Sequence, residues 1–256
     1  MYIEFLWLFI GVILAMIAPD RGGEPEPVRN TETGLLTRAV TVGKTSYSYQ
    51  VYVPANLRES RSAPVILFLH GIGQRGSGGL LQATGASIEF ARAYLEQIPA
   101  IIVLPQCLNG RLWPEPDMEQ MAIAALDQSA AEFGGDASRL YLTGVSMGGY
   151  GAWSLASAYP DKFAAVVPIC GGSPLRTPDR FASIARKVAR TPVWVFHGAD
   201  DRIVPVSESR SMVKALKDVN GNVRYSEFAG VGHNVWLNAL AERELLPWML
   251  SQRLSK

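Results

Sequence analysis

Short apolar segments alternate with longer segments of helical period along most of this sequence, and that alternation limits the possible folds more than any other feature. Uninterrupted apolar runs are typical of strands that are buried on both faces of a parallel sheet. They occupy residues 64–69, 100–104, 140–145, 164–169, 192–196 and 223–228. Helical periodicity occupies residues 87–97, 119–133, 148–158, 207–219 and 239–251. The pattern predicts an α/β fold with a doubly wound, mostly parallel sheet, in which right-handed crossovers place helices on both faces.

Two further strands are expected ahead of this pattern. Residues 40–42 and 47–53 favour an antiparallel pair around a turn at Gly43 and Lys44. They bring the predicted sheet to eight strands. Because no repeat or low-complexity segment interrupts the sequence, we expect residues 31–256 to form one domain.

The N-terminal segment differs from the rest of the chain. Residues 5–18 are apolar without interruption, and glycines and prolines between residues 22 and 27 then break any helix. The run is shorter than the ~20 residues that span a bilayer, but it fits the apolar centre of a signal peptide. We therefore expect residues 1–18 to be a signal peptide or an uncleaved membrane anchor, residues 19–30 to be a linker, and the protein to be exported. The usual basic residues before the run are missing, and a buried N-terminal helix is the alternative.

Charge and composition exclude two classes of protein. The chain carries 24 Lys and Arg against 23 Asp and Glu, a net charge of +1, so it lacks the basic surface that nucleic-acid binding needs. A hydrophobic content of 48% with 18% charged residues excludes a disordered chain.

Two cysteines and three histidines are few for a metal site, since a structural zinc takes about four such ligands. We expect neither a metal nor a cofactor.

The motif Gly144-Val145-Ser146-Met147-Gly148 follows a predicted strand directly and opens a predicted helix. A tight strand-to-helix turn needs small residues, and it would expose the Ser146 hydroxyl at the carboxyl edge of the sheet. The Met147 amide would then lie at a helix N-terminus, which favours developing negative charge. Ser146 is therefore the candidate nucleophile.

A serine nucleophile needs a neighbouring base and an acid that orients the base. His70 and His197 both end predicted strands, and we interpret them as packed residues that order loops. His233 lies in a glycine-containing loop after the last strand and is the candidate base. Asp200 and Asp201 both follow the strand at 192–196, and either could be the acid.

Five stretches in order resemble a known family. They are Leu69-His70-Gly71-Ile72-Gly73-Gln74-Arg75-Gly76, Pro105-Gln106-Cys107 with Trp113, the serine motif, His197-Gly198-x-x-Asp201-x-x-Val204-Pro205, and Gly232-His233-Asn234-x-Trp236. The chain beyond the linker resembles the α/β-hydrolase serine esterases. Within them it is similar to an exported predicted-peptidase and phospholipase/carboxylesterase-like group, with feruloyl esterases and polyhydroxybutyrate depolymerases as more distant kin. That group often has Glu where Gln74 stands here.

The resemblance implies a catalytic domain that hydrolyses carboxylic esters through an acyl-enzyme on Ser146. By the same resemblance, Asp201 is the acid and the backbone N–H groups of Ile72 and Met147 form the oxyanion hole. The implied partner is an ester, small or linked to a polymer, with a bulky alcohol or aryl part. A serine peptidase of the prolyl-oligopeptidase type and a non-catalytic hydrolase-like binding protein are the alternatives.

The segment between the strands at 164–169 and 192–196 is too short for a large cap domain, so an open cleft is expected. The loop 105–117 would form one wall, and we predict Trp113 and Trp236 as substrate contacts. Cys107 and Cys170 each come at the end of a predicted strand, and the expected strand order places two other strands between these two. At ~4.8 Å per strand the two cysteines would lie about 14 Å apart, which is too far for a disulfide. Two free thiols are therefore predicted.

Overall fold

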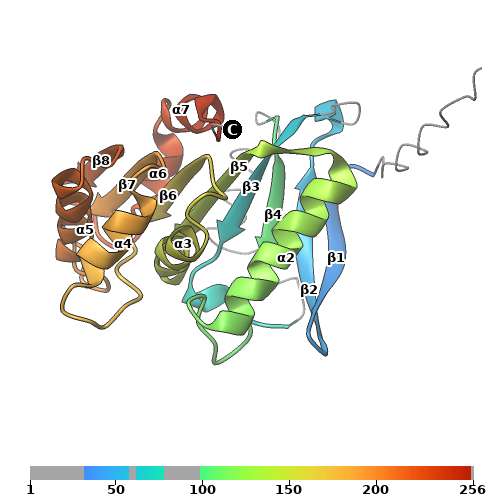
Figure 1. Ribbon diagram of the computed structural model, residues 1–256, viewed down its shortest axis with the longest axis horizontal. Helices are drawn as coiled ribbons and strands as arrows, with labels where there is room; N and C mark the ends of the chain where they lie inside the picture. Colours follow the sequence, from blue (N-terminus) through green and yellow to red (C-terminus); the bar gives the residue numbers. More distant parts are fainter. Residues whose placement is uncertain (1–31, 58–61, 78–98, 255–256) are drawn as a thin grey trace, which may run out of the picture.

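A computed structural model describes residues 32–57, 62–77 and 99–254 of the chain (Figure 1). The strands are β1 (Gly34–Val42), β2 (Thr45–Val53), β3 (Ala63–Leu69), β4 (Ile101–Pro105), β5 (Gly135–Val145), β6 (Ala165–Ile169), β7 (Val193–Gly198) and β8 (Val223–Phe228). The α-helices are α2 (Pro116–Phe133), α3 (Met147–Ala158), α4 (Arg180–Val188), α5 (Ser207–Asp218), α6 (Trp236–Ala241) and α7 (Leu245–Ser251). Two short 3₁₀ helices, η1 (Ala55–Leu57) and η2 (Ile72–Gln74), follow β2 and β3.

The strands form one eight-stranded sheet in the order β1-β2-β4-β3-β5-β6-β7-β8. β1 and β2 pair antiparallel around Gly43, whose φ of 60° suits a residue without a side chain, and β2 pairs antiparallel with β4. All the other neighbouring strands are parallel. The predicted mostly parallel sheet, including its antiparallel edge, is confirmed, and the carboxyl ends of β3 to β8 share one edge.

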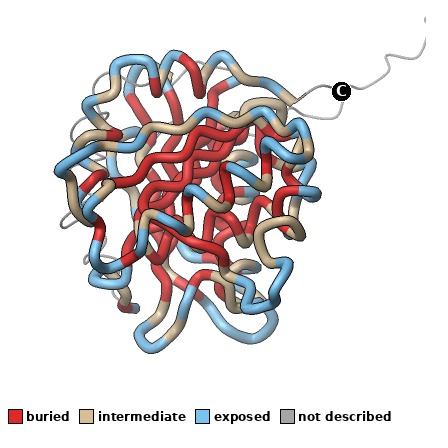
Figure 2. The backbone as a smooth tube through the Cα atoms, turned by 90° about the vertical axis from the view of Figure 1, so that its left-hand side faces the viewer, coloured by how far each residue is buried: buried red, intermediate tan, exposed pale blue. Residues whose placement is uncertain are grey.

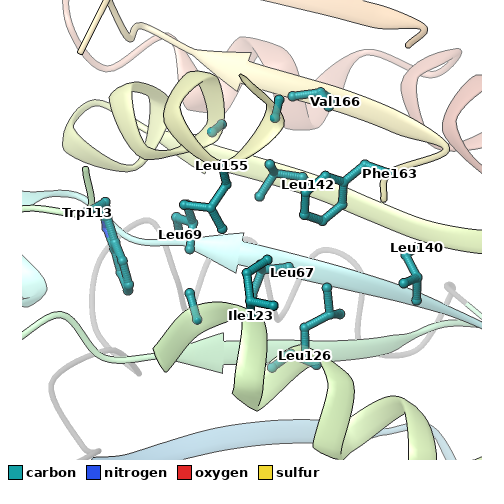
Figure 3. Packing of buried hydrophobic residues seen from close by; sticks show 14 of the residues in the cluster. Leu67, Leu69, Trp113, Ile123, Leu126, Leu140, Leu142, Leu155, Phe163 and Val166 are labelled. Carbon is teal, nitrogen blue, oxygen red and sulfur yellow. The ribbon is translucent and has the colours of Figure 1, made fainter. Parts of the chain in front are cut away.

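Two hydrophobic cores lie on opposite faces of the sheet, because successive side chains of a strand point to opposite sides. On β3, Val65, Leu67 and Leu69 pack into the core beneath α2 to α5, while Ile66 and Phe68 face the core beneath α6 and α7. Figure 2 shows the central strands buried along their length, and Figure 3 shows side chains of α2 and α3 meeting β3 and β5. All seven β3 residues are buried, which explains the uninterrupted apolar run in the sequence.

The helices differ from the prediction in two respects. The predicted helix at 239–251 is two helices, α6 and α7, with a break at residues 242–244. Pro247 favours this break, because proline fits the first turn of a helix but removes a hydrogen bond and clashes within its interior. Helix α4 was not expected, and the predicted helix at 87–97 lies outside the described residues, as do residues 1–31. In the described ranges, no helix is long and apolar enough to cross a membrane.

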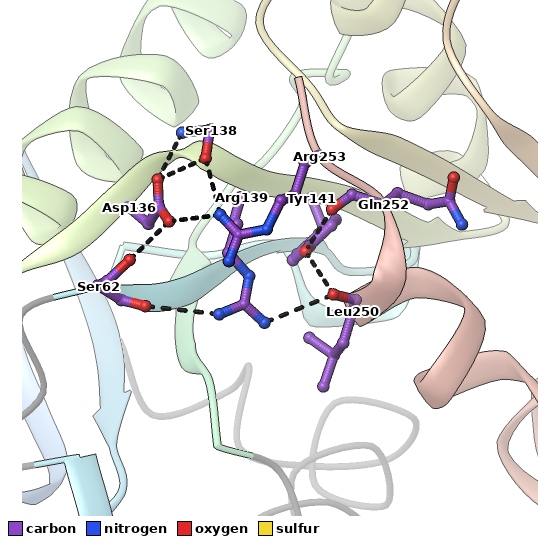
Figure 4. A network of polar contacts seen from close by, with 8 residues as sticks. All are labelled: Ser62, Asp136, Ser138, Arg139, Tyr141, Leu250, Gln252 and Arg253. Carbon is purple, nitrogen blue, oxygen red and sulfur yellow. Dashed lines mark hydrogen bonds and ion pairs between the residues drawn. The ribbon is translucent and has the colours of Figure 1, made fainter. Parts of the chain in front are cut away.

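A polar network fastens the segment after α7 to the start of β5 (Figure 4). The Asp136 carboxylate accepts hydrogen bonds from the Ser62 hydroxyl at 2.6 Å, from the Ser138 amide and hydroxyl at 2.9 and 2.7 Å, and from Arg253 at 3.1 Å. The Leu254 amide donates to the Ser138 carbonyl at 2.9 Å. The bonds from Ser62, Ser138 and Arg253 hold the pKa of Asp136 well below its usual value.

We expect Asp136→Asn to lower the free energy of unfolding at about pH 7 by about 1–3 kcal/mol, because donors facing a carboxylate lose charge-assisted bonds. The pKa of Asp136 is lower in the folded protein than in the unfolded chain, where it is about 3.9, so the ionised carboxylate stabilises the fold above that pH. This stabilisation is lost as the pH falls toward the folded-state pKa. The difference in the free energy of unfolding between wild type and Asp136→Asn, measured by urea unfolding, should therefore narrow as the pH falls from about 5 to about 2. The matched control is Asp161→Asn, which removes the exposed pair with Arg190 and should change little. A difference in the free energy of unfolding that stays constant with pH would contradict this explanation.

Candidate active site

Ser146 occupies a sharp turn between β5 and α3 whose backbone is strained. Its φ of 57° and ψ of −115° lie in a region that costs about 1–3 kcal/mol for a residue with a side chain. Backbone packing around the turn leaves no room at the neighbouring glycines. A Cβ on Gly144 would lie 2.2 Å from the Gly148 carbonyl oxygen, and one on Gly148 would lie 1.9 Å from the Leu69 carbonyl oxygen. The glycines of the motif are therefore required by contact with β3 and with each other.

Three side chains from separate loops meet at the carboxyl edge of the sheet. His233 Nε2 lies 2.8 Å from Ser146 Oγ, and His233 Nδ1 lies 2.7 Å from Asp201 Oδ2. Ser146 follows β5, Asp201 follows β7 and His233 follows β8. The side chain of Asp201 is buried, whereas Asp200 is exposed. Of the two candidate acids, the structure thus brings Asp201 to His233.

Asp201 is held as a carboxylate by several donors. Its Oδ1 accepts the backbone N–H groups of Ile203 at 2.9 Å and Val204 at 3.0 Å. Burial alone raises the pKa of Asp201, but the hydrogen bonds from His233 and from these two amides outweigh it, and the pKa is lowered. An ionised Asp201 accepts the Nδ1–H of His233, which leaves the Nε2 lone pair facing the Ser146 hydroxyl.

His197 lies behind Asp201, and the sequence interpretation missed this contact. Its Nε2 lies 3.0 Å from the Val204 carbonyl oxygen and 3.3 Å from Asp201 Oδ2, and its Nδ1 lies 2.7 Å from the Ser209 hydroxyl. Burial lowers the pKa of His197, which favours the neutral ring. A neutral imidazole donates from one nitrogen only, so Nε2–H faces Val204 and Asp201 while Nδ1 accepts from Ser209. His197 is the packed, loop-ordering residue that was expected, and the loop that it orders carries the acid.

The predicted oxyanion donors, Ile72 and Met147, line the same cavity as Ser146. Met147 is the first residue of α3 and Ile72 is the first residue of η2. Within the described residues, neither backbone amide donates a hydrogen bond. Gly71 closely approaches the nucleophile, since a Cβ there would lie 3.9 Å from Ser146 Cβ. Two free amides beside a nucleophile are the arrangement that stabilises a developing oxyanion.

Trp113 was predicted as a substrate platform, and the structure contradicts that prediction. Its side chain is 0% exposed, and its indole N–H donates to the His70 carbonyl oxygen at 2.9 Å. The indole also packs edge-on against the His70 ring, whose Nε2 accepts the Cys107 amide at 3.1 Å. Pro114, the next residue, does line the site. The ring of Trp113 therefore packs inside the protein behind the cavity wall and does not face the cavity.

Trp236 lies near the base but outside the cavity. Its ring meets that of His233 edge-on, with centroids 6.3 Å apart. It is half-buried at the start of α6 and does not line the main cavity. A contact between Trp236 and a leaving group remains a prediction.

An open cavity of about 410 Å³ begins at Ser146. The loop before α2 and the loop after β6 supply most of its walls, and no large cap covers it in the described part of the chain. Three exposed apolar side chains stand at its mouth: Ile72, Leu112 and Ile203, with exposed fractions of 54%, 45% and 71%. The remaining lining residues are Pro114, Glu115, Ser146, Met147, Tyr150, Ser173, Pro174 and Arg176.

In the described ranges, Cys170, Asp201 and His233 offer three possible metal-ligand atoms that lie within 4.8 Å of one another. Asp201 and His233 are already hydrogen-bonded to each other. Burial raises the pKa of Cys170 to about 12, so the side chain is a neutral thiol, a poor metal ligand. Cys107 and Cys170 are both free and buried, as predicted.

The fold and the arrangement of Ser146, His233 and Asp201 define the class of this protein: the chain is an α/β-hydrolase. A sequence model of the phospholipase/carboxylesterase family matches residues 117–243, which include all three residues. The solved structure of a thermostable esterase is similar with a TM-score of 0.76 at 30% identity, covering 86% of this chain and 63% of that one. These likenesses are to esterases, and they agree with the α/β-hydrolase fold of this chain.

Curated relatives agree with this class. The carboxylesterase SOBER1 of Arabidopsis thaliana is 28% identical over 193 residues, which cover 66% of this chain and 83% of that protein. A protein of Arthroderma benhamiae that is called secreted is 26% identical over 227 residues, covering 75% of this chain and 23% of that protein. The chain spans about half the length of two relatives from Salmonella that it also matches.

Proposed function

We propose that the protein hydrolyses carboxylic esters through an acyl-enzyme on Ser146. The observation that carries the proposal is the continuous chain of hydrogen bonds from Ser146 Oγ to His233 and from His233 to the buried Asp201. A serine hydroxyl attacks a carbonyl only when a base removes its proton, and an imidazole does so only in the tautomer that Asp201 selects here.

In the first half of the reaction, Ser146 Oγ bonds to the ester carbonyl carbon while its proton passes to His233 Nε2. The carbonyl oxygen becomes an oxyanion, and the N–H groups of Ile72 and Met147 are the proposed donors to it. When the tetrahedral intermediate collapses, the bond to the alcohol oxygen breaks and His233 returns the proton to the leaving alcohol. The products of this half are one alcohol and one acyl-serine.

In the second half, His233 Nε2 takes a proton from water as the hydroxide bonds to the acyl carbon. The bond to Ser146 Oγ then breaks, and the proton on His233 returns to the serine. One ester and one water yield one acid and one alcohol, and Asp201 stays ionised throughout. No step in this sequence draws on a metal or an organic cofactor.

The openness of the site supports an ester with a bulky alcohol or aryl part, because no large cap in the described ranges limits the leaving group. A sugar ester or a polymer-linked ester would fit this arrangement. Labelling by a fluorophosphonate and hydrolysis of a series of esters from acetyl to feruloyl test the proposal, with a peptide series run alongside. Peptide cleavage without ester cleavage would favour the peptidase, and no labelling would favour a binding protein.

We further propose that the protein is exported. Residues 5–18 form the apolar run, and one relative is called a secreted protein. Expression of the full chain should give a mature form in the exported fraction that lacks about the first 18 residues. Peptide mapping of its N-terminus distinguishes cleavage from a retained anchor, and a full-length chain confined to the cytoplasm would contradict the proposal.

A further inference from the structure

One cationic side chain in the wall of the cavity has no acidic partner. Arg176 lies in the loop after β6, is exposed, and lines the cavity together with Ser146. In residues 32–57, 62–77 and 99–254, it makes no ion pair and no hydrogen bond to a side chain. An unpaired guanidinium in the wall of a cavity that contains a nucleophile is free to bind an anionic group of a substrate.

The two carboxylates of the surrounding walls are already engaged. Glu115 pairs with Arg111 and accepts the Leu112 amide at 2.6 Å. Glu208 pairs with Arg180 at 2.5 Å and accepts the amide of Ser173 at 3.0 Å. Both acids hold the walls in place, so neither competes for Arg176.

Tyr150 supplies a second polar group in the same cavity. It is half-buried, and its hydroxyl makes no hydrogen bond with any described residue. Burial raises the pKa of Tyr150, and the charge of Glu208 raises it further, while the positive charges of Arg176 and Arg180 act in the opposite direction. The phenol therefore remains a neutral O–H donor within electrostatic range of Arg176.

The lining residues also indicate which part of an ester enters the cavity. They include Ser146 and both residues of the predicted oxyanion hole, but not His233 or Trp236. A leaving alcohol must receive its proton from His233, so the alcohol lies on the His233 side and the acyl chain lies in the cavity. Apolar Ile72, Leu112 and Ile203 at the mouth fit the methylene part of such a chain.

We propose that Arg176 and Tyr150 bind a carboxylate at the far end of the acyl group, so that the preferred substrates are half-esters of dicarboxylic acids. This inference rests on the proposed esterase function of the same site. Arg176 and Tyr150 are here specificity residues, which bind substrate and take no part in proton transfer.

The test compares benzyl half-esters of succinate, glutarate and adipate with benzyl esters of branched hydrocarbon acyl groups of matched shape. For at least one acyl length, wild-type kcat/KM should be about tenfold higher for the anionic ester. Arg176→Ala should remove that preference by lowering kcat/KM for the anionic esters about tenfold, Arg176→Lys should keep part of it, and Tyr150→Phe should reduce it about threefold. Added salt should weaken it, because Arg176 is exposed.

Arg202→Ala is the matched control, since Arg202 is exposed and charged but lies outside the cavity lining. It should keep the wild-type preference. The inference would be wrong if wild type hydrolysed every neutral ester faster than the matched anionic ester. It would also be wrong if Arg202→Ala lost the preference as fully as Arg176→Ala. Either result would leave the esterase proposal intact. Absence of hydrolysis of all the esters would instead refute the esterase proposal itself.

Discussion

Replacing Ser146 by alanine should lower kcat by at least about 10⁴-fold while the protein stays folded. Alanine removes only the hydroxyl that faces His233 Nε2 at 2.8 Å. The backbone strain at φ 57° stays the same, because alanine has the same Cβ. The measurement is kcat for a neutral benzyl ester, together with thermal unfolding and fluorophosphonate labelling.

Ser157→Ala provides the matched control for this experiment. Ser157 is on the same helix, α3, and its hydroxyl donates to the Ser154 carbonyl oxygen at 3.0 Å, away from the cavity. It should leave kcat and labelling unchanged. Hydrolysis by Ser146→Ala at near the wild-type rate would remove Ser146 as the nucleophile.

Replacing Asp201 by asparagine should lower kcat by about 10⁴-fold. The asparagine oxygen can still accept the amides of Ile203 and Val204, so the loop should keep its shape. Its NH₂ group would then face His233 Nδ1 and donate to it. That bond selects the tautomer with a proton on Nε2, which cannot accept the proton of Ser146.

Asp200→Asn separates this effect from a general change of charge near the site. Asp200 is exposed, and its contact in this loop is a backbone one, from its amide to the Val231 carbonyl oxygen at 3.0 Å. The variant should keep kcat within about twofold of wild type. A large loss in Asp200→Asn with little loss in Asp201→Asn would reassign the acid.

The sheet could be predicted from the sequence because its strands are buried on both faces. β3 and β4 are apolar at every position, which leaves little ambiguity in their assignment. Helix α4 could not be predicted as easily, since it is short and follows a loop with glycine and proline residues. The break between α6 and α7 was missed because the apolar periodicity continues across residues 242–244, although Pro247 marks the new helix.

The order of Ser146, Asp201 and His233 along the chain was enough to predict that they meet, since all three follow parallel strands whose carboxyl ends share one edge of the sheet. The choice of Asp201 over Asp200 needed the family resemblance, because adjacent residues of one loop cannot be distinguished by spacing. The orientation of Trp113 could not be predicted, since it depends on the tertiary contact with the His70 carbonyl oxygen. The contact of His197, near the end of β7, with Asp201 depends in the same way on how the loop after β7 folds.

The serine turn and the cavity mouth differ sharply in how much sequence change they can accept. A methyl group at Gly144 or Gly148 would collide with backbone atoms, whereas the side chains of Ile72, Leu112 and Ile203 extend into solvent. Descendants of this sequence can therefore replace the mouth residues at little cost in folding and diverge in substrate range. The reacting geometry is constrained much more tightly, because the turn has no room for a side chain at Gly144 or Gly148.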